Sequence, residues 1–458
     1  MEKFYLSDYL KVQKKESVKD ISFYKLCQKI NKEFIREWEN GKDNLDSALR
    51  IQKKAIIGYE NEVSFFKSRI REIINKYNAE QTSFPSWYQS LEDGIYHENW
   101  GLAGVSEWFN EKFKESSSAK IIGDRVYFLE NGQMCLKPQT ITKDRREQMI
   151  RSFLLLTPEE RLDKEFHEIY MLDGTRVTIY GGSMTKKGQD VIIFRRYIIP
   201  RYSFEEQAAR GTIPRDSILL LKTMVSLGFN VAFTGAVRTA KTTFLATWQS
   251  YEDRSLEGVM VETDPEIPIH TIMPDAPILQ IIADNEKLKH LSKNLLRSDA
   301  DYFIIAEARD GIALDTAVKL ASKGTRRIKI TFHSRDPLDF SYDVAFEIIK
   351  SLGGDLESTA KKVAASFDYI FHFIQLKNKN QKRLKSIYEL GIDRRTREIT
   401  MKEICRYDHK NDKWGWNSIM TEDKQRIGEE ENPEALEIFK RELAALSAHG
   451  EYKDDNSN

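Results

Sequence analysis

Cysteine is scarce in this chain. Three cysteines occur among 458 residues, and they lie far apart at positions 27, 135 and 405. Disulfide frameworks use an even number of cysteines, and cysteine zinc sites use Cys-x-x-Cys pairs. The sequence fits neither pattern, so we expect neither a disulfide-stabilised fold nor a cysteine zinc site.

Long apolar segments and a surplus of one charge are also missing. No run approaches the roughly 20 apolar residues of a membrane-spanning helix, and the first residues lack the charged-then-apolar profile of a signal peptide. Lysine plus arginine and aspartate plus glutamate both number 71, so the formal net charge is zero. This balance implies no general attraction to nucleic acid or anionic membranes. We expect a cytoplasmic protein whose membrane association, if any, is peripheral.

Residues 1–82 are predicted to form a helical N-terminal extension. Apolar residues recur at helical spacing, with Ile30, Phe34 and Trp38 on one stripe and a second stripe between Leu45 and Ile56. Two interpretations remain open. The helices pack on their own protein as a charged outer layer, or they form a module that docks a partner or caps an oligomer.

Residues 83–202 are predicted to form an α+β domain. Short β-like runs alternate with turn signals such as Gly123-Asp124 and Asn131-Gly132. The expected strands are 121–122, 125–129, 176–180 and 191–199, and the expected helices are 105–113 and 143–155.

Residues 203–425 are predicted to form an α/β domain with a parallel sheet and a C-terminal β-hairpin. The strand candidates are rich in Val, Ile and Phe and alternate with helices, which is typical of strands buried on both faces. They span 230–234, 258–261, 302–306, 327–332 and 369–375. The hairpin is expected at 383–390 and 396–407 with its turn at Asp393, and residues 426–458 are expected to hold an amphipathic helix and a flexible tail.

The most informative segment is Val231-Ala-Phe-Thr-Gly235-Ala-Val-Arg-Thr-Ala240-Lys241-Thr242-Thr243. It reads as a buried strand, a phosphate-binding loop and the first turn of a helix, whose backbone N–H groups converge on a nucleotide phosphate. In such loops the lysine reaches the β- and γ-phosphates and the following hydroxyl ligates Mg²⁺. The expected nucleotide-binding residues are Gly235, Arg238, Thr239, Ala240, Lys241, Thr242 and Thr243.

Further motifs follow in an order that suits nucleotide hydrolysis. Two strands end in carboxylates, one at Glu262-Thr-Asp264-Pro-Glu266 and one at Glu307, which has the form of a Walker B element. A third strand ends at His333, and Arg195-Arg196 lies upstream. Each alone has a structural explanation, such as a helix cap or surface charge, but their joint spacing behind a Lys-Thr loop favours a catalytic site.

Over about 87–416, the chain resembles the hexameric traffic ATPases of type II and type IV secretion and of type IV pilus assembly, in particular the Cpa/Tad-type pilus and conjugation branch. Besides the loop, the likeness lies in segments 172–177, 194–197, 262–267, 296–309, 331–334 and 406–416. It implies an N-terminal α+β domain, a RecA-like ATPase domain and a homo-hexamer that uses ATP and Mg²⁺. It also implies an inner-membrane secretion or pilus platform as partner and a place at the inner face of the cell membrane.

The resemblance also implies roles for individual residues. Glu307 would be the Walker B glutamate and, with Thr242, would hold Mg²⁺, partly through water. Glu266 would help orient the attacking water, and His333 would couple the γ-phosphate to motion. Arg195 and Arg196 would stabilise the developing charge.

The loop departs from the family pattern where glycine is expected. Ala236, Arg238 and Ala240 stand at three glycine positions, and forcing a non-glycine residue to positive φ costs about 1–2 kcal/mol. Every charged or hydroxyl group is retained, so we expect a working but slow ATPase. We expect no direct contact with nucleic acid. The alternatives are a degenerate ring-forming scaffold and, because the hairpin is basic, a DNA motor.

Overall fold

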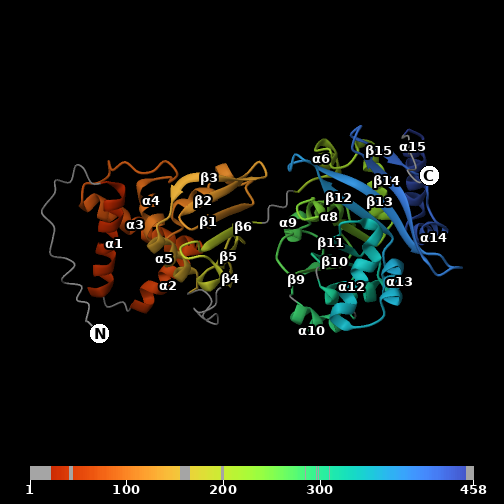
Figure 1. Cartoon of the computed structure of the whole chain (residues 1–458), viewed down its shortest axis with the longest axis horizontal. Helices are drawn as coiled ribbons and strands as arrows, with labels where there is room; N and C mark the ends of the chain where they lie inside the picture. The colour runs from red at the N-terminus through yellow and green to blue at the C-terminus, as the bar shows by residue number, and fades with distance from the viewer. Residues whose placement is uncertain are drawn as a thin grey trace. The chain divides into compact units, whose positions relative to one another are not determined.

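The computed structural model describes residues 22–40, 45–154, 166–196, 201–283, 285–295, 297, 299–308 and 310–449. The expected flexible tail at 450–458 lies outside this range. Two compact units, 1–198 and 199–458, are described separately below (Figure 1). None of the described helices is both long enough and apolar enough to cross a membrane.

The N-terminal unit begins with four helices. They are α1 (Phe23–Asn40), α2 (Leu45–Ile56), α3 (Glu60–Lys76) and α4 (Leu91–Asn99). The predicted helical stripe is confirmed, because Ile30 and Phe34 are fully buried. Phe34, Phe66 and Trp100 form an aromatic cluster in which ring centroids lie 4.5–5.7 Å apart. Burial of these large rings is what holds the charged helices together.

The second part of this unit is an antiparallel sheet with the order β3-β2-β1-β6-β5-β4. Its strands are β1 (Ser118–Ile122), β2 (Arg125–Glu130), β3 (Gln133–Thr140), β4 (Phe166–Tyr170), β5 (Arg176–Tyr180) and β6 (Val191–Arg195). The helix α5 (Lys143–Leu154) comes between β3 and β4 in the chain. The predictions for β1, β2, β5, β6 and α5 are confirmed, whereas β3 and β4 were not predicted.

One predicted helical stretch of this unit is of the 3₁₀ type. Residues 105–113 form two 3₁₀ segments, η3 (Ala103–Phe109) and η4 (Glu111–Phe113), instead of an α-helix. Ala103, Gly104, Val105, Ser106 and Trp108 are all buried. A segment buried on nearly every side carries no 3.6-residue pattern that separates an α-helix from tighter turns. A further 3₁₀ turn is η5 (Gly182–Met184).

The C-terminal unit is built on a nine-stranded sheet with the order β15-β14-β13-β12-β7-β11-β10-β8-β9. The strands from β12 to β9 run parallel, and β13 to β15 continue the sheet antiparallel. Their bounds are β7 (Val231–Gly235), β8 (Gly258–Glu262), β9 (Ile278–Ile282), β10 (Tyr302–Ala306), β11 (Lys329–Phe332), β12 (Tyr369–Gln375), β13 (Lys382–Ile392), β14 (Ile399–Asp408) and β15 (Lys413–Trp416). The predicted α/β class is confirmed, and the parallel order, with β11 and β10 between β7 and β8, is that of a RecA-like domain.

Helices cover both faces of this sheet. The helical segments are α6 (Phe204–Ala209), η6 (Arg215–Ser217), α7 (Ile218–Ser226), α8 (Lys241–Ser250), α9 (Ile269–Ile272), α10 (Asn285–Leu295), α11 (Gly311–Ser322), η7 (Pro337–Asp339), α12 (Phe340–Leu352), α13 (Leu356–Ser366), α14 (Glu422–Glu431) and α15 (Pro433–His449). Alternate residues of one strand belong to different cores. Val231 and Phe233 pack in the core that includes α7, α8 and α15, whereas Ala232 packs in the core that includes α11, α12 and α13. This alternation follows from the two-residue repeat of a strand.

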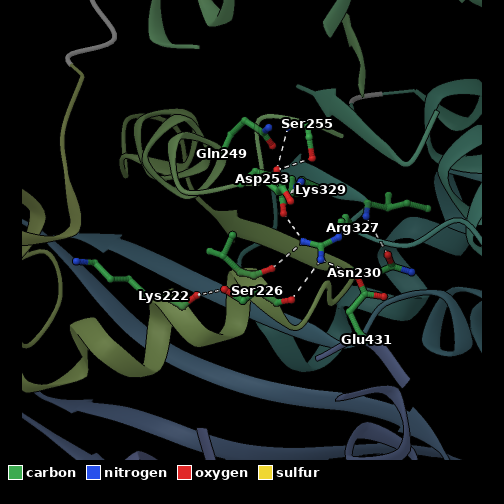
Figure 2. Close-up of polar contacts among 12 residues, drawn as sticks. Lys222, Ser226, Asn230, Gln249, Asp253, Ser255, Arg327, Lys329 and Glu431 are labelled. Carbon is green, nitrogen blue, oxygen red and sulfur yellow. Dashed lines mark hydrogen bonds and ion pairs between the residues drawn. The ribbon is translucent and has the colours of Figure 1, made fainter. Parts of the chain in front are cut away.

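Buried charges join the ends of several of these elements (Figure 2). The Lys329 ammonium is fully buried at the start of β11 and donates to the carboxylate of Glu252 over 2.6 Å. Arg327 also pairs with Glu252, donates to the carbonyls of Val225 and Ser226 at the end of α7, and pairs with Glu431 of α14 over 2.6 Å. Burial lowers the pKa of Lys329, and the Glu252 carboxylate opposes that effect. Each buried charge therefore has a partner, as the cost of removing ions from water requires.

We predict that Lys329→Met lowers the free energy of unfolding by about 3 kcal/mol, because the substitution leaves the Glu252 carboxylate buried with one cation fewer. Denaturant titration measures the change. The matched control is Lys319→Met, which removes an exposed ion pair with Asp315 on α11 and should cost less than about 1 kcal/mol. Equal effects of the two substitutions would contradict the assigned importance of the buried pair.

Candidate functional site

The phosphate-loop sequence occupies the connection between β7 and α8. Gly235, the last residue of β7, has a φ of 137°, and a Cβ at this position would lie 2.2 Å from the Phe373 carbonyl oxygen of β12. A glycine is therefore required here by the close approach of two backbones. Thr239 is buried and its hydroxyl donates to the Ala236 carbonyl over 2.9 Å, which closes the loop into a compact turn.

The two loop residues that replace glycines nearest the lysine adopt glycine-like conformations. Arg238 has a φ of 64° and Ala240 a φ of 76°. The expectation of backbone strain is thus confirmed at these two positions, while Ala236 is not among the described residues with positive φ. Ala240 is also the N-cap of α8 and supplies no side-chain hydrogen bond to the first turn. The first N–H groups of this helix are therefore not capped by that residue, unlike those of a helix with a Ser, Asp or Asn cap.

Lys241 is buried at the start of α8. Its ammonium donates to the carbonyls of Gly235 over 3.0 Å and Ala236 over 2.7 Å, and it lies 3.3 Å from Nδ1 of His333. His333 follows directly after β11, which pairs with β7 so that Phe332 lies opposite Thr234. The sequence placed the lysine and the histidine in one site, and the structure brings their side chains into contact. Thr242 and Thr243 follow in the first turn of α8 and are partly exposed.

The carboxylates lie at the ends of two adjacent strands. Glu262 is the last residue of β8, and its strand partner is Ala306, directly before Glu307. Glu307 has a φ of 54°, and its backbone N–H donates to the Thr331 hydroxyl over 2.7 Å. Parallel strands thus bring the two acidic motifs together, as carboxyl ends of neighbouring strands do in open α/β sheets.

Glu262 is the buried carboxylate of the acidic segment. Its side chain accepts hydrogen bonds from the N–H groups of Ile267 over 3.0 Å and Glu266 over 3.2 Å. Burial raises the pKa of Glu262 to about 7 against these hydrogen bonds, and the charges of Glu307 and Asp264 raise it further. The sequence directs attention to Glu266, which is partly exposed, whereas the buried carboxylate is that of Glu262. Its position as the last residue of a buried strand is the signal that identifies it.

A basic side chain from the hairpin is an additional feature near the loop. Lys382 begins β13 and pairs with Gln375 of β12, two residues beyond the contact of Phe373 with Gly235. Burial lowers the pKa of Lys382 to about 8, and the charge of Arg238 lowers it further. Lys382 therefore adds a second cation near Arg238 of the loop.

Arg195 and Arg196 belong to the N-terminal unit and have different environments. Arg195 is the exposed last residue of β6. The Arg196 guanidinium stacks on the Trp108 ring, 3.6 Å from its centroid, and donates to the Trp108 carbonyl over 2.8 Å. Burial lowers the pKa of Arg196. Tyr197, which follows Arg196 in its motif, and Arg309, two residues after Glu307 in another motif, lie outside the described residues.

No family model and no curated protein matches the chain. Among solved structures, it is similar to the VirB11 ATPase of the Brucella suis type IV secretion system in complex with sulphate. The identity is 13%, the match covers 62% of this chain and 92% of the other, and the TM-score is 0.34. The Legionella pneumophila ATPase DotB matches at 14% identity over 74% and 85% of the two chains with a TM-score of 0.44. The pilus retraction motor PilT with bound ADP matches at 13% identity over 71% and 86%, with a TM-score of 0.43.

We predict that Ala240→Gly stabilises the chain by about 0.5 kcal/mol. The substitution relieves about 1–2 kcal/mol of left-handed strain and adds about 0.5–1 kcal/mol of backbone entropy to the unfolded chain. Denaturant titration measures the sum. The control is Ala444→Gly at an exposed position inside α15, which should destabilise by about 1 kcal/mol. A loss in Ala240→Gly as large as in this control would show that Ala240 is not strained.

We predict that Glu262→Gln changes the pH dependence of stability. Because folding raises the pKa of Glu262 from 4.5 to about 7, the folded chain retains a proton that the unfolded chain releases. The parent therefore loses stability as the pH rises between these values, by about 3 kcal/mol in total. The free energy of unfolding of Glu262→Gln relative to the parent should increase between pH 4.5 and pH 8, as measured by denaturant titration. Parallel pH profiles would rule out the perturbed carboxyl group.

Proposed function

We propose that the chain is an ATPase that hydrolyses ATP to ADP and phosphate in the presence of Mg²⁺. The observation that carries the proposal is the convergence of Lys241, His333 and Glu307 at the ends of adjacent parallel strands. In the structure the Lys241 ammonium donates to two carbonyls of its own loop. Phosphate oxygens are stronger acceptors for such a cation. The N–H groups at the start of α8 add donors for the same phosphates.

The side chains divide the chemistry among them. Lys241 binds the phosphates and stabilises the charge that develops on the leaving group and the transferred phosphoryl group. Glu307, assisted by the acidic segment with Glu266 and Glu262, orients the attacking water. His333, beside the lysine, responds to the γ-phosphate. Of the two arginines, Arg195 is the better candidate for a charge-stabilising arginine, since Arg196 is engaged with Trp108.

The oxygen donors near the loop suit magnesium. Mg²⁺ prefers hydroxyl, carboxylate and phosphate oxygens and retains several waters, so it needs few protein ligands. Among the described residues no group of three or more His, Cys, Asp and Glu side chains forms a metal site of its own. Thr242 and, through water, Glu307 would hold the ion together with the nucleotide phosphates. When bound, Mg²⁺ neutralises charge on the β- and γ-phosphates.

We further propose that the chain works as a homo-hexameric motor of the secretion and pilus traffic ATPase family, in its Cpa/Tad-type and conjugation branch. Support comes from the order of sequence motifs and from the α+β unit that precedes the RecA-like sheet. Such a motor would act in the cytoplasm at the inner face of the membrane on a secretion or pilus platform. Its cargo would be a protein or a conjugative substrate handed over by the platform, without direct contact between the chain and nucleic acid.

One observation favours a second function, a ring-forming scaffold of the same machinery that does not turn over nucleotide. Arg238 and Ala240 have positive φ and carry a Cβ where the family has glycine. A side chain at these positions reduces the space for phosphate. The scaffold and the motor differ in one measurable property, nucleotide turnover that depends on Lys241.

We predict that Lys241→Ala lowers Mg²⁺-dependent ATP turnover at least about 10²-fold without unfolding the chain, since it removes a charge that acts in the transition state. Phosphate release by parent and variant is measured over a range of protein concentrations, with Lys350→Ala at an exposed position on α12 as control. Turnover per chain that increases with concentration would support an oligomer. Equal turnover in parent and Lys241→Ala would refute the ATPase assignment, and a folded parent that neither binds nor hydrolyses ATP would favour the scaffold.

A further inference from the structure

The end of β11 holds the backbone of Glu307. Thr331, the third residue of β11, is 2% exposed, and its hydroxyl accepts the Glu307 N–H over 2.7 Å. Its carbonyl accepts the N–H of the next residue, Ala308, over 3.1 Å. One residue thus fixes two consecutive N–H groups at the point where β10 ends.

This anchoring coincides with an unfavourable backbone conformation. Glu307 has a φ of 54°, in the left-handed region that residues with a Cβ avoid at a cost of about 1–2 kcal/mol. Such conformations persist where the surroundings over-determine them, and they concentrate at functional sites. The Thr331 hydroxyl is a local group that compensates the cost, since a buried N–H without an acceptor is itself unfavourable by about 1–3 kcal/mol.

The backbone conformation of Glu307 decides where its carboxylate lies. Ala306, directly before Glu307, lies opposite Glu262 in the pairing of β10 with β8, so the backbone of Glu307 is adjacent to the acidic segment. A residue with helical or extended φ at this position would direct the side chain differently. His333, two residues after Thr331, contacts Lys241. The end of β11 therefore connects the backbone of the acidic residue to the lysine of the loop.

We propose that Thr331 is a positioning residue, whose hydroxyl holds Glu307 in the left-handed conformation that places its carboxylate for hydrolysis. The inference rests on the proposed function, because it assumes that Glu307 acts on the attacking water. Thr331 does not touch nucleotide in this role. It acts through the hydrogen bond to the Glu307 N–H, so any residue that retains the hydroxyl should retain the effect.

The test compares Thr331→Val, which keeps the shape and removes the hydroxyl, with Thr331→Ser, which keeps the hydroxyl. Thr223→Val in α7 is the matched control, since it removes another buried hydroxyl with a hydrogen bond to the backbone, in this case donated to the Leu220 carbonyl. For Thr331→Val we expect kcat to fall about 10-fold to 10²-fold, as for a small misplacement of a catalytic group. The ATP dissociation constant should stay within about threefold. Thr331→Ser and Thr223→Val should keep kcat within about threefold of the parent.

A second readout does not depend on activity. Hydrogen exchange followed by mass spectrometry on a peptide covering 302–308 reports on the Glu307 N–H. Without the hydroxyl acceptor, this amide should exchange about tenfold faster in Thr331→Val, and it should remain protected in Thr331→Ser.

The inference is overturned if Thr331→Val keeps the kcat of the parent, if Thr331→Ser loses as much kcat as Thr331→Val, or if exchange at 302–308 is the same in all variants. A parent chain without ATP turnover would refute the proposed function instead. In that case the exchange comparison still decides whether the hydroxyl holds Glu307.

Discussion

The register of the parallel strands determines where the strand-end residues of the candidate site lie. β7, β11, β10 and β8 are neighbours, and each ends at the same edge of the sheet. Gly235, His333, Glu307 and Glu262 come at or directly after these ends. A shift of one residue in any pair would turn the side chains of that strand to the opposite face. The apolar cores on both faces, which accept alternate residues of each strand, therefore fix the site as firmly as any polar contact within it.

Strained backbone and the buried ion pairs lie in different parts of this unit. Three non-glycine residues at the site edge, Arg238, Ala240 and Glu307, have positive φ. At the start of β11 lies the buried network of Lys329, Arg327 and Glu252, which joins α7, β11 and α14. The strain amounts to about 1–2 kcal/mol per residue. Strained backbone of this kind concentrates at functional sites.

Patterns of hydrophobicity and turn residues were sufficient to predict the parallel strands other than β9, the C-terminal hairpin and most of the N-terminal helices. β7 and β10, with almost every residue buried, show the continuous apolar run of a sheet covered on both faces. β3 was missed because only one of its residues is buried and it includes a proline, and β9 was missed because it is an edge strand without a buried residue. The type of helix at 103–113 could not be predicted, since burial on nearly all sides removes the period.

The site shows a similar division. Lys241 and His333 were predicted together because each belongs to a motif with a fixed place relative to a strand, and strand ends meet in space. The hydrogen bond from Glu307 to Thr331, the perturbed carboxyl group of Glu262 and the proximity of Lys382 to Arg238 depend on burial and backbone conformation. Residue types alone carry no information about these quantities. The predicted participation of Arg195 and the predicted oligomeric state stay predictions, because the contacts within one chain do not test them.

Gly235 approaches the Phe373 carbonyl closely, and this contact shows that residues of one loop are required for different reasons. This glycine is required by the packing of two strands, whatever the loop binds. The lysine and threonine that follow have no comparable duty toward the fold, because a shorter side chain at either position would leave the strands paired. A chain with this fold that bound no nucleotide would still need Gly235 and would be free to lose Lys241 and Thr242. Under the proposed function, nucleotide binding would depend on the second half of the loop, whereas the packing of the sheet depends on the first.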